Sequence, residues 1–359
     1  MMFRSACLFL PLAVVLSLPG CKKADLEPDA AVDQLDAEVP VVDATPFGWE
    51  ALPAKKDGGP GRDGPLVALD GQPLKKDGPT VSLDAPPPPP DFTSPVGTLP
   101  PLVTTTVAAI QYAEGQAAAV KPACTSTPEP DVCALKELTL QARQAGAAFV
   151  LFPEDALFHP APGDKIWLEY TPAVGDNPGT SSKYSSETFA KTFSYQAAQL
   201  GIYLIIHMHT INPSDKKYYS TQVAFGPDGV VLAVHRKFNL FGNESTWLTP
   251  GNEVEVFQTP LGKMGLLVCA DIYGSSTLLN KLAKTLGARV VLISSYWTVS
   301  GPIQSYYLPY AKTWGVYAAV GNTTDSPGYG GVIATPTGTA IAQVSKTAPS
   351  VLLGTIPLP

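Results

Sequence analysis

From residue 102 to its C-terminus, the sequence alternates between short apolar runs and amphipathic segments. Residues 103–111, 147–152 and 203–209 are predicted to be buried strands. Residues 131–145 and 186–200 lie between them, and their apolar side chains recur every three or four positions, as on one face of a helix. Helices that alternate with mostly apolar strands indicate an α/β layered fold.

The same alternation continues to the end of the chain. We predict further strands at residues 221–225, 230–236, 264–268, 290–293, 316–321, 331–334 and 340–344, and further helices at 276–286 and 305–314. The sequence therefore predicts one folded domain over residues 101–359.

The beginning of the chain has the layout of an export signal. Residues 1–20 combine a basic start at Arg4, an apolar run and a short polar end. Small residues immediately before Cys21 resemble a bacterial lipoprotein signal, in which Cys21 becomes the lipidated first residue. An ordinary secretory cleavage near the same place is the alternative. We expect a protein of the bacterial cell envelope, anchored to a membrane by lipid or secreted.

Residues 21–100 are rich in proline, glycine, aspartate and alanine and contain almost no aromatic side chains. Such a segment cannot bury a core, so we predict a disordered, solvated tether. Residues 22–100 carry 14 acids and 7 bases, a net charge of -7, whereas residues 101–359 carry 17 acids and 16 bases, a net charge of -1. A nearly neutral domain lacks the basic face that nucleic-acid binding requires.

Three cysteines lie in the predicted domain. In an oxidising compartment Cys124 and Cys133, close together in a loop rich in proline and threonine, are predicted to form a disulfide, and two unpaired surface thiols are the alternative. Cys269 then remains as the free thiol. It ends an apolar run and precedes a segment that can open a helix, so we expect a sharp strand-to-helix turn that projects a nucleophile. The simpler interpretation is a small buried hydrophobic residue.

Chemically useful side chains follow three of the predicted strands. Glu154 comes after the strand that ends at Phe152, Lys237 ends a second strand and Cys269 ends a third. Proteins with α/β folds bind ligands at the carboxyl ends of their strands. The sequence thus offers an acid/base, a cation and a thiol, although taken singly Glu154 could cap a helix and Lys237 could be a solvated charge.

These three strand ends carry the residues of a known family. Residues 150–156 (Val-Leu-Phe-Pro-Glu-Asp-Ala), 235–241 (His-Arg-Lys-Phe-Asn-Leu-Phe) and 269–272 (Cys-Ala-Asp-Ile) resemble the three catalytic signatures of the nitrilase, or carbon–nitrogen hydrolase, superfamily. The first two are most similar to the vanin and biotinidase branch, whose members cleave secondary amides such as pantetheine or biotinyl-lysine. Ala270 departs from that branch, which usually has an aromatic residue there, so the substrate stays open.

The resemblance implies a four-layer αββα sandwich and a hydrolase that works through a thioester. Cys269 would attack the amide carbon, while Lys237 and a backbone N–H near Ala270 would stabilise the oxyanion. Glu154 would carry the proton from the thiol to the departing amine and then activate water. Glu244 resembles the second glutamate of the family, which orients the lysine or the substrate.

The resemblance implies no cofactor and a small-molecule amide as the partner. Family members often assemble as dimers or larger oligomers, so it also implies a homodimer or a larger assembly. Tyr296 and Trp297 follow a strand and either line the acyl pocket or pack in the core. His207 and His209 share one face of a strand, but no third ligand is evident in the sequence, so we expect a buried pair and no metal site.

Two other functions remain compatible with these residues. An enzyme of the same fold could pass the acyl group to an amine in place of water. An inactive domain could retain the fold only to bind a ligand at the cell surface, although the presence of all four catalytic residue types argues against it.

Overall fold

The computed structural model describes residues 103–157, 169–185, 188–274, 276–297, 301–325, 328–345 and 347–359. The predicted signal, the tether and Cys21 lie outside the described residues. Within the described ranges, no helix has both the length and the apolar character needed to cross a membrane.

Thirteen strands of the described chain form one continuous sheet. Its main path, from edge to edge, is β6 (Val231–Arg236), β5 (Tyr218–Phe225), β4 (Tyr203–Ile211), β2 (Ala147–Leu151), β1 (Val103–Gln111), β11 (Tyr317–Asn322), β9 (Val290–Ser295), β8 (Gly262–Val268) and β7 (Val256–Thr259). Four strands extend this path: β3 (Glu169–Tyr170) beside β4, β15 (Ser350–Thr355) beside β1, β13 (Gly331–Ala334) beside β11, and β14 (Ala340–Val344) beside β13. A separate pair joins β10 (Gly301–Pro302) to β12 (Gly328–Tyr329).

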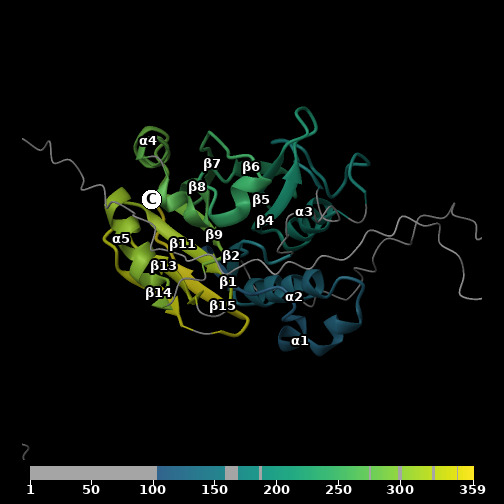
Figure 1. The fold of residues 1–359 in the computed structure, drawn as a ribbon. Coiled ribbons are helices and arrows are strands. Elements are labelled where there is room, and N and C mark those ends of the chain that lie inside the picture. Colours follow the sequence, from purple (N-terminus) through teal and green to yellow (C-terminus); the bar gives the residue numbers. More distant parts are fainter. Residues whose placement is uncertain are drawn as a thin grey trace, which may run out of the picture. The chain divides into compact units, whose positions relative to one another are not determined.

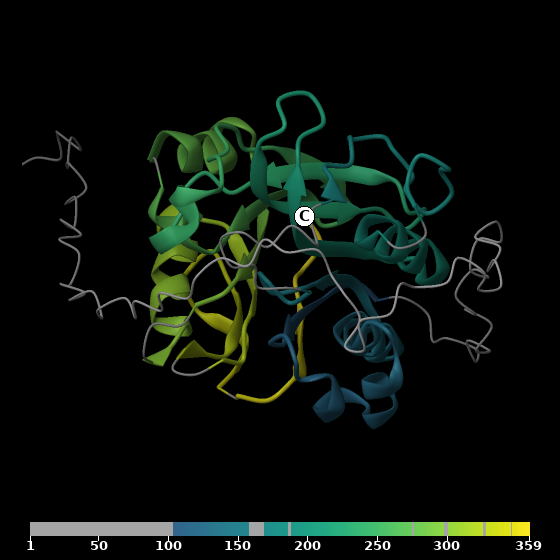
Figure 2. The ribbon, with the colours of Figure 1, turned by 45° about the vertical axis from the view of Figure 1, so that its right-hand side comes forward.

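Helices cover both outer faces of this sheet, which bends so that its two halves pack together (Figure 1). On one side are α1 (Ala117–Val120), α2 (Pro130–Gln144) and α3 (Phe189–Leu200). On the other are α4 (Ser276–Asn280), its π-helical continuation at Lys281–Thr285, and α5 (Gln304–Trp314). Figure 2 shows the same succession of layers from a second direction. The predicted four-layer αββα fold is confirmed.

Strand β1 shows how the sequence produces these layers. Side chains alternate along a strand, so neighbours point to opposite faces of the sheet. Ala108 and Ile110 belong to the core beneath α2 and α3, whereas Val107 and Ala109 belong to the core between the two halves of the sheet. All four are fully buried, which is why this strand appears in the sequence as a continuous apolar run.

The parallel strands decide where the strand ends lie. Strands β4, β2, β1, β11, β9 and β8 pair in parallel, and β6 has the same direction because it is antiparallel to β5, which is antiparallel to β4. The carboxyl ends of β2, β6 and β8 therefore point in one direction.

The observed elements differ from the predicted ones mainly where the sequence is polar or short. Strand β7 has only four residues, and its polar Gln258 hides the apolar pattern, although it forms a hairpin with β8. Strand β15 was also not predicted, although its six residues, SVLLGT, are neither unusually few nor mainly polar. The predicted helix over residues 276–286 changes to π-helical geometry at Lys281, and the first two residues of the predicted helix 186–200 lie outside the described residues.

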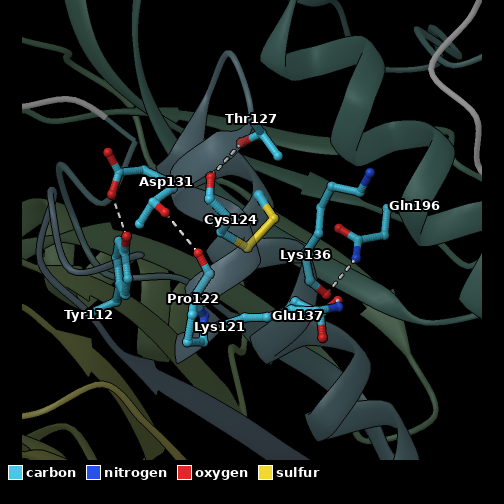
Figure 3. The surroundings of a disulfide bond; sticks show 11 residues. Tyr112, Lys121, Pro122, Cys124, Thr127, Asp131, Lys136, Glu137 and Gln196 are labelled. Carbon is cyan, nitrogen blue, oxygen red and sulfur yellow. Dashed lines mark hydrogen bonds and ion pairs between the residues drawn. A yellow bond between two sulfur atoms is a disulfide. The ribbon is translucent and has the colours of Figure 1, made fainter. Parts of the chain in front are cut away.

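A disulfide joins Cys124 to Cys133 close to α2 (Figure 3). The surrounding segment is not the loop expected from the sequence, because Cys124 lies in a 3-10 helix, Pro122–Ser126, and Cys133 lies in the first turn of α2. Proline at the first position of each helix explains this, since its fixed φ suits a helix start. Gln196 of α3 donates to the carbonyl of Lys136 at 3.0 Å and ties the two helices together.

Candidate active site

The acid, the cation and the thiol predicted from the sequence meet in the structure. Glu154 follows β2, Lys237 follows β6, and Cys269 follows β8, and these strands end in the same direction. The N–H of Lys237 donates to the carbonyl of Ser220 at 2.9 Å, which continues the β5–β6 ladder by one residue and fixes the lysine backbone.

Lys237 lies between two glutamates. Its Nζ is 2.8 Å from Oε1 of Glu154 and 2.7 Å from Oε1 of Glu244. Lys237 and Glu154 are each 2% exposed, so this pairing takes place away from bulk water. Oε2 of Glu244 accepts the N–H of Phe241 at 2.8 Å, which fixes its position in the loop after β6. An ammonium held this firmly can stabilise a developing negative charge without first reorganising.

Cys269 occupies the sharp turn that the sequence predicts. Its φ is 43°, a left-handed value that is uncommon for a non-glycine residue. It opens a 3-10 helix, Cys269–Tyr273, immediately after β8, and its side chain is buried. Strained backbone of this kind persists where the surrounding structure holds it, commonly at functional sites. Ala270 lies in the first turn of this helix, where N–H groups have no acceptor within the helix.

The backbone of Tyr296 connects Cys269 to Glu154. Its N–H donates to Oε2 of Glu154 at 2.9 Å, and its carbonyl oxygen lies 3.9 Å from Sγ of Cys269. With Lys237 on one oxygen and Tyr296 on the other, the Glu154 carboxylate has a defined orientation. This backbone contact was not predicted, because β1 and β11 separate β2 from β9 in the sheet and only the folded sheet brings the ends of β2 and β9 together.

Asp271 holds the cysteine turn against the end of β6, a role that was not predicted. One carboxylate oxygen accepts the N–H groups of Phe238 and Asn239 at 3.0 and 2.9 Å. The other accepts the N–H of Val268 at 2.9 Å and lies 2.7 Å from Nε2 of His235. The aspartate is fully buried. A lone carboxylate inside an apolar run was the available signal in the sequence, since such groups are rarely buried without partners.

Two further contacts join the same segments. Nδ2 of Asn239 donates to the carbonyl of Ala270 at 2.7 Å. The ring of Phe238 packs so closely on Gly274 that a Cβ there would lie 1.8 Å from a ring carbon, so this position requires glycine. The loop that carries Lys237 and the turn that carries Cys269 are thus bound to each other on both sides of Cys269.

The electrostatics of the three groups follow from burial and from their mutual contacts. Burial raises the pKa of Glu154 to about 7, and Asp155 and Glu244 add to this rise while Lys237 opposes it. Burial alone would lower the pKa of Lys237, but the charges of Glu154, Cys269 and Glu244 outweigh it and raise that pKa well above its usual value.

Burial and the nearby Glu154 raise the pKa of the Cys269 thiol, although Lys237 lowers it. The resting thiol is therefore protonated near neutral pH, and it needs a base to become a nucleophile. A carboxylate whose pKa is about 7 is suited to remove a proton and to return it later.

Tyr296 and Trp297 have different surroundings. Trp297 is 5% exposed and packs against the rings of Tyr306 and Tyr307, which favours the core interpretation for this residue. Tyr296 is partly buried, and its hydroxyl donates to Oδ2 of Asp325 at 2.8 Å.

The two strand histidines have a neighbour that was not predicted. Nδ1 of His207 and Nδ1 of His209 lie 3.5 and 3.7 Å from Oδ1 of Asp155, so the expectation that no third ligand is near was wrong. However, Nδ1 of His207 accepts the N–H of Asp155 at 3.1 Å, and its Nε2 is 2.7 Å from Oγ of Ser220. Both ring nitrogens are engaged, so a metal would have to displace one of these partners.

Comparison with known proteins gives this site its family context. Residues 106–359 match the family model described as carbon-nitrogen hydrolase. The chain belongs to the carbon–nitrogen hydrolase family.

Within this family, the chain is similar to the omega-amidase NIT2 of Xenopus tropicalis, with 36% identity over 146 residues, which cover 38% of this chain and 48% of the relative. It is 34% identical to the human omega-amidase NIT2 over 142 residues, which cover 37% of this chain and 46% of the relative. The chain thus spans about half the length of these curated relatives. The structure of an amidase from Nesterenkonia sp. superposes with a TM-score of 0.56 at 18% identity, covering 73% of this chain and 93% of that chain. This likeness supports the fold.

Proposed function

We propose that this carbon–nitrogen hydrolase cleaves amides through a thioester on Cys269. The observation that carries the proposal is the position of Lys237, whose Nζ is bound by Glu154 and Glu244 beside the buried thiol. An amide is a poor electrophile with a poor leaving group, so its cleavage needs a nucleophile, an oxyanion stabiliser and a proton carrier together. These three groups are present at one set of strand ends.

In the first half of the reaction, Sγ of Cys269 bonds to the amide carbon while Glu154 takes the thiol proton. The carbonyl oxygen becomes an oxyanion, which Lys237 and the N–H of Ala270 stabilise. The C–N bond then breaks as Glu154 passes the proton to the leaving nitrogen, and an acyl thioester remains.

In the second half, Glu154 removes a proton from water as the water oxygen attacks the thioester carbon. The C–S bond breaks, the carboxylic acid leaves, and the thiolate recovers the proton from Glu154. Glu244 keeps Nζ of Lys237 in place throughout, because its other oxygen is fixed by the N–H of Phe241.

For the substrate, we infer a small secondary amide of the kind that vanins and biotinidase cleave. The support is the local sequence, Pro-Glu-Asp-Ala at residues 153–156 and Lys-Phe-Asn-Leu-Phe at 237–241. The omega-amidase relatives favour a different substrate, an amide at the end of a carbon chain. Both substrates would react through an acyl thioester on Cys269, and they would differ in the acyl group and in the leaving nitrogen.

Intact-protein mass spectrometry tests the proposal. The protein is mixed briefly with a panel of amides that includes pantetheine, biotinyl-lysine and simple primary amides, beside the Cys269→Ala variant. We expect an acyl adduct on the wild type alone, whose mass gives the acyl group. If iodoacetamide labels Cys269 but none of the amides is turned over or forms an adduct, the amidase proposal is wrong for these substrates. Added amines that become acylated would instead indicate acyl transfer.

We also propose that Cys21 is lipidated and anchors the domain to the bacterial envelope through the tether of residues 21–100. The support is the signal-like layout of residues 1–20 and the composition of the tether. Growth with a clickable fatty acid should label the wild-type protein, and Cys21→Ser should lose the label and leave the membrane fraction. Equal labelling of both proteins would reject lipidation at Cys21.

A further inference from the structure

His207 connects the backbone beside Glu154 to the backbone of Lys237. Its Nδ1 accepts the N–H of Asp155 at 3.1 Å, and Asp155 follows Glu154 directly. Its Nε2 lies 2.7 Å from Oγ of Ser220 in β5. The carbonyl oxygen of Ser220 accepts the N–H of Lys237 at 2.9 Å. We call the side chains of His207 and Ser220 together the His–Ser bridge.

The strand register explains why the His–Ser bridge reaches Lys237. Across β4 and β5, His209 is opposite Ser220, and the β5–β6 register, continued by one residue, places Lys237 opposite Ser220 as well. His207 precedes His209 by two residues, so it lies on the same face of β4 and diagonal to Ser220. Ile205 of β4 belongs to this face too, and it packs in the core between the two halves of the sheet.

The His–Ser bridge closes a ring of contacts with the buried ion pair. The side chains of Glu154 and Lys237 meet at 2.8 Å, and the bridge joins their backbone segments. Glu154, Lys237, His207 and Ser220 are each at most 2% exposed. Neither backbone segment can move away without leaving a buried polar group unpaired, which is unfavourable. The ring therefore restrains the distance between the carboxylate and the ammonium.

The backbone that His207 binds has an uncommon conformation. The φ of Asp155 is 56°, a left-handed value that few residues other than glycine adopt. Such a conformation persists where the surrounding structure holds it. The hydrogen bond from the N–H of Asp155 to Nδ1 of His207 is one of the contacts that hold this turn. The turn immediately follows Glu154, so its conformation affects where the Glu154 carboxylate points.

The two contacts of His207 require one form of its ring. Nδ1 accepts an N–H and therefore carries no hydrogen, so the ring hydrogen is on Nε2. Nε2 then donates to Oγ of Ser220. An asparagine at this position can supply an acceptor near Nδ1 but no donor at the place of Nε2, so substitution can separate the two contacts.

We propose that His207, acting with Ser220, is a positioning residue for the reaction: it holds the turn after β2 so that Glu154 meets Lys237. The inference rests on the proposed function, because it concerns the acid/base and the lysine of that reaction. His207 carries no proton of the substrate. A misplaced carboxylate slows proton transfer without weakening substrate binding, so loss of the His–Ser bridge lowers kcat and leaves KM nearly unchanged.

Two substitutions break the same bond from opposite sides. Ser220→Ala removes Oγ but keeps the carbonyl that binds Lys237, and His207→Asn removes the donor but keeps an acceptor for Asp155. With an amide that the wild type turns over, each should lower kcat by about 10- to 100-fold and change KM by about twofold or less. The double variant should be about as slow as the slower single variant, because effects within one contact chain are not additive. Fully additive effects would overturn the proposal.

His207→Phe tests partial rescue. It keeps a ring but removes both nitrogens, so the N–H of Asp155 also loses its acceptor. We expect kcat of His207→Phe to be lower than that of His207→Asn by about threefold or more. If His207→Phe does not fold, Ser220→Ala and His207→Asn still decide the proposal. Values of kcat within about threefold of the wild type in both of these variants would overturn it.

Thr221→Val is the matched control. Oγ1 of Thr221 lies 2.7 Å from Oγ1 of Thr210, so it is also a buried hydroxyl that joins β5 to β4. Side chains alternate along a strand, so this contact lies on the opposite face of the sheet from Ser220. The variant should keep kcat within about twofold of the wild type. Equal decreases in Thr221→Val and Ser220→Ala would assign the effect to the stability of the sheet and overturn the proposal.

Amide hydrogen exchange tests the His–Ser bridge without any substrate. In the full-length protein, exchange of the Asp155 N–H is followed by mass spectrometry of peptides that contain it. Loss of Oγ in Ser220→Ala lets the ring of His207 turn, so this N–H should exchange about tenfold faster than in the wild type, but at the wild-type rate in Thr221→Val. If no amide is turned over, the amidase proposal fails, while faster exchange still supports the bridge. Unchanged exchange in Ser220→Ala would reject the bridge.

Discussion

Nζ of Lys237 lies 2.8 Å from Oε1 of Glu154, and both side chains are almost completely buried. An ion pair of this kind is costly to desolvate, and breaking it by removing one partner is more costly than replacing both. The pair therefore indicates a functional constraint. In the proposed mechanism its two members have different tasks, because Glu154 moves protons and Lys237 stabilises the oxyanion.

Removal of the ammonium should nearly abolish activity. Lys237→Ala removes an oxyanion donor, and we expect kcat to decrease by about 100- to 1000-fold. Steady-state assays should be compared with those of Lys263→Ala, which removes an exposed lysine that donates to the carbonyl of Leu286. Activity within tenfold of the wild type in Lys237→Ala, with the fold intact by circular dichroism, would contradict the role of Lys237.

The pH dependence of the reaction should report Glu154. Burial raises its pKa to about 7, and the general base must be ionised, so kcat/KM should increase as the pH rises through about 7 and decrease below it. Glu154→Gln should have very low activity without this acidic limb. Glu244→Gln should retain this acidic limb while lowering kcat, because Glu244 positions Lys237 and takes no part in the proposed proton transfers. An acidic limb centred near the ordinary carboxyl value of 4.5 would contradict the assignment.

Asp271 should contribute strongly to stability, because its carboxylate accepts three backbone N–H groups and contacts His235. In Asp271→Asn an amide N–H₂ would face one of these donors. We expect the free energy of unfolding to decrease by about 2–4 kcal/mol, measured by urea denaturation. Asp215→Asn, at an exposed turn, should change it by about 0.5 kcal/mol or less. An equal change in both variants would show that the buried network contributes little.

The Cys124–Cys133 disulfide should stabilise the domain without contributing to catalysis. Its sequence separation is 9, and closing a loop of this size restricts the unfolded chain by about 2–3 kcal/mol. The double variant Cys124→Ser/Cys133→Ser should have a free energy of unfolding lower by that amount, measured by urea denaturation. Its activity at 25 °C should be unchanged. A reducing agent should shift the unfolding of the wild type alone. Loss of activity in the folded double variant would contradict a purely structural role.

How much of the candidate active site could be predicted from the sequence depends on the kind of contact. Glu154, Lys237 and Cys269 each follow an apolar run, so a local pattern places each at a strand end. The backbone of Tyr296 follows a strand too, but no local pattern shows which strand ends are neighbours. The order of β2, β1, β11 and β9 in the sheet decides that, and it is a property of long-range pairing.

The histidines show the same limit. The alternation along β4 shows that His207 and His209 share a face, and this prediction needs only the period of a strand. Asp155 comes near them because β2 pairs with β4 and because its own φ of 56° turns the chain after Glu154. A left-handed aspartate cannot be inferred from composition, so the third member of this cluster was missed.

By itself the sequence determined the layered class of the fold, the strand ends that carry the thiol, the cation and the acid, and the resemblance to one enzyme family. Each of these follows from residue type and short-range periodicity, which depend on the backbone geometry of single elements. Only the tertiary structure decided that Lys237 lies between two glutamates, that Asp271 binds the cysteine turn to the end of β6, and that the backbone of Tyr296 contacts both Glu154 and Cys269. Those facts depend on contacts between residues far apart in the chain, and packing of the complete sheet determines them.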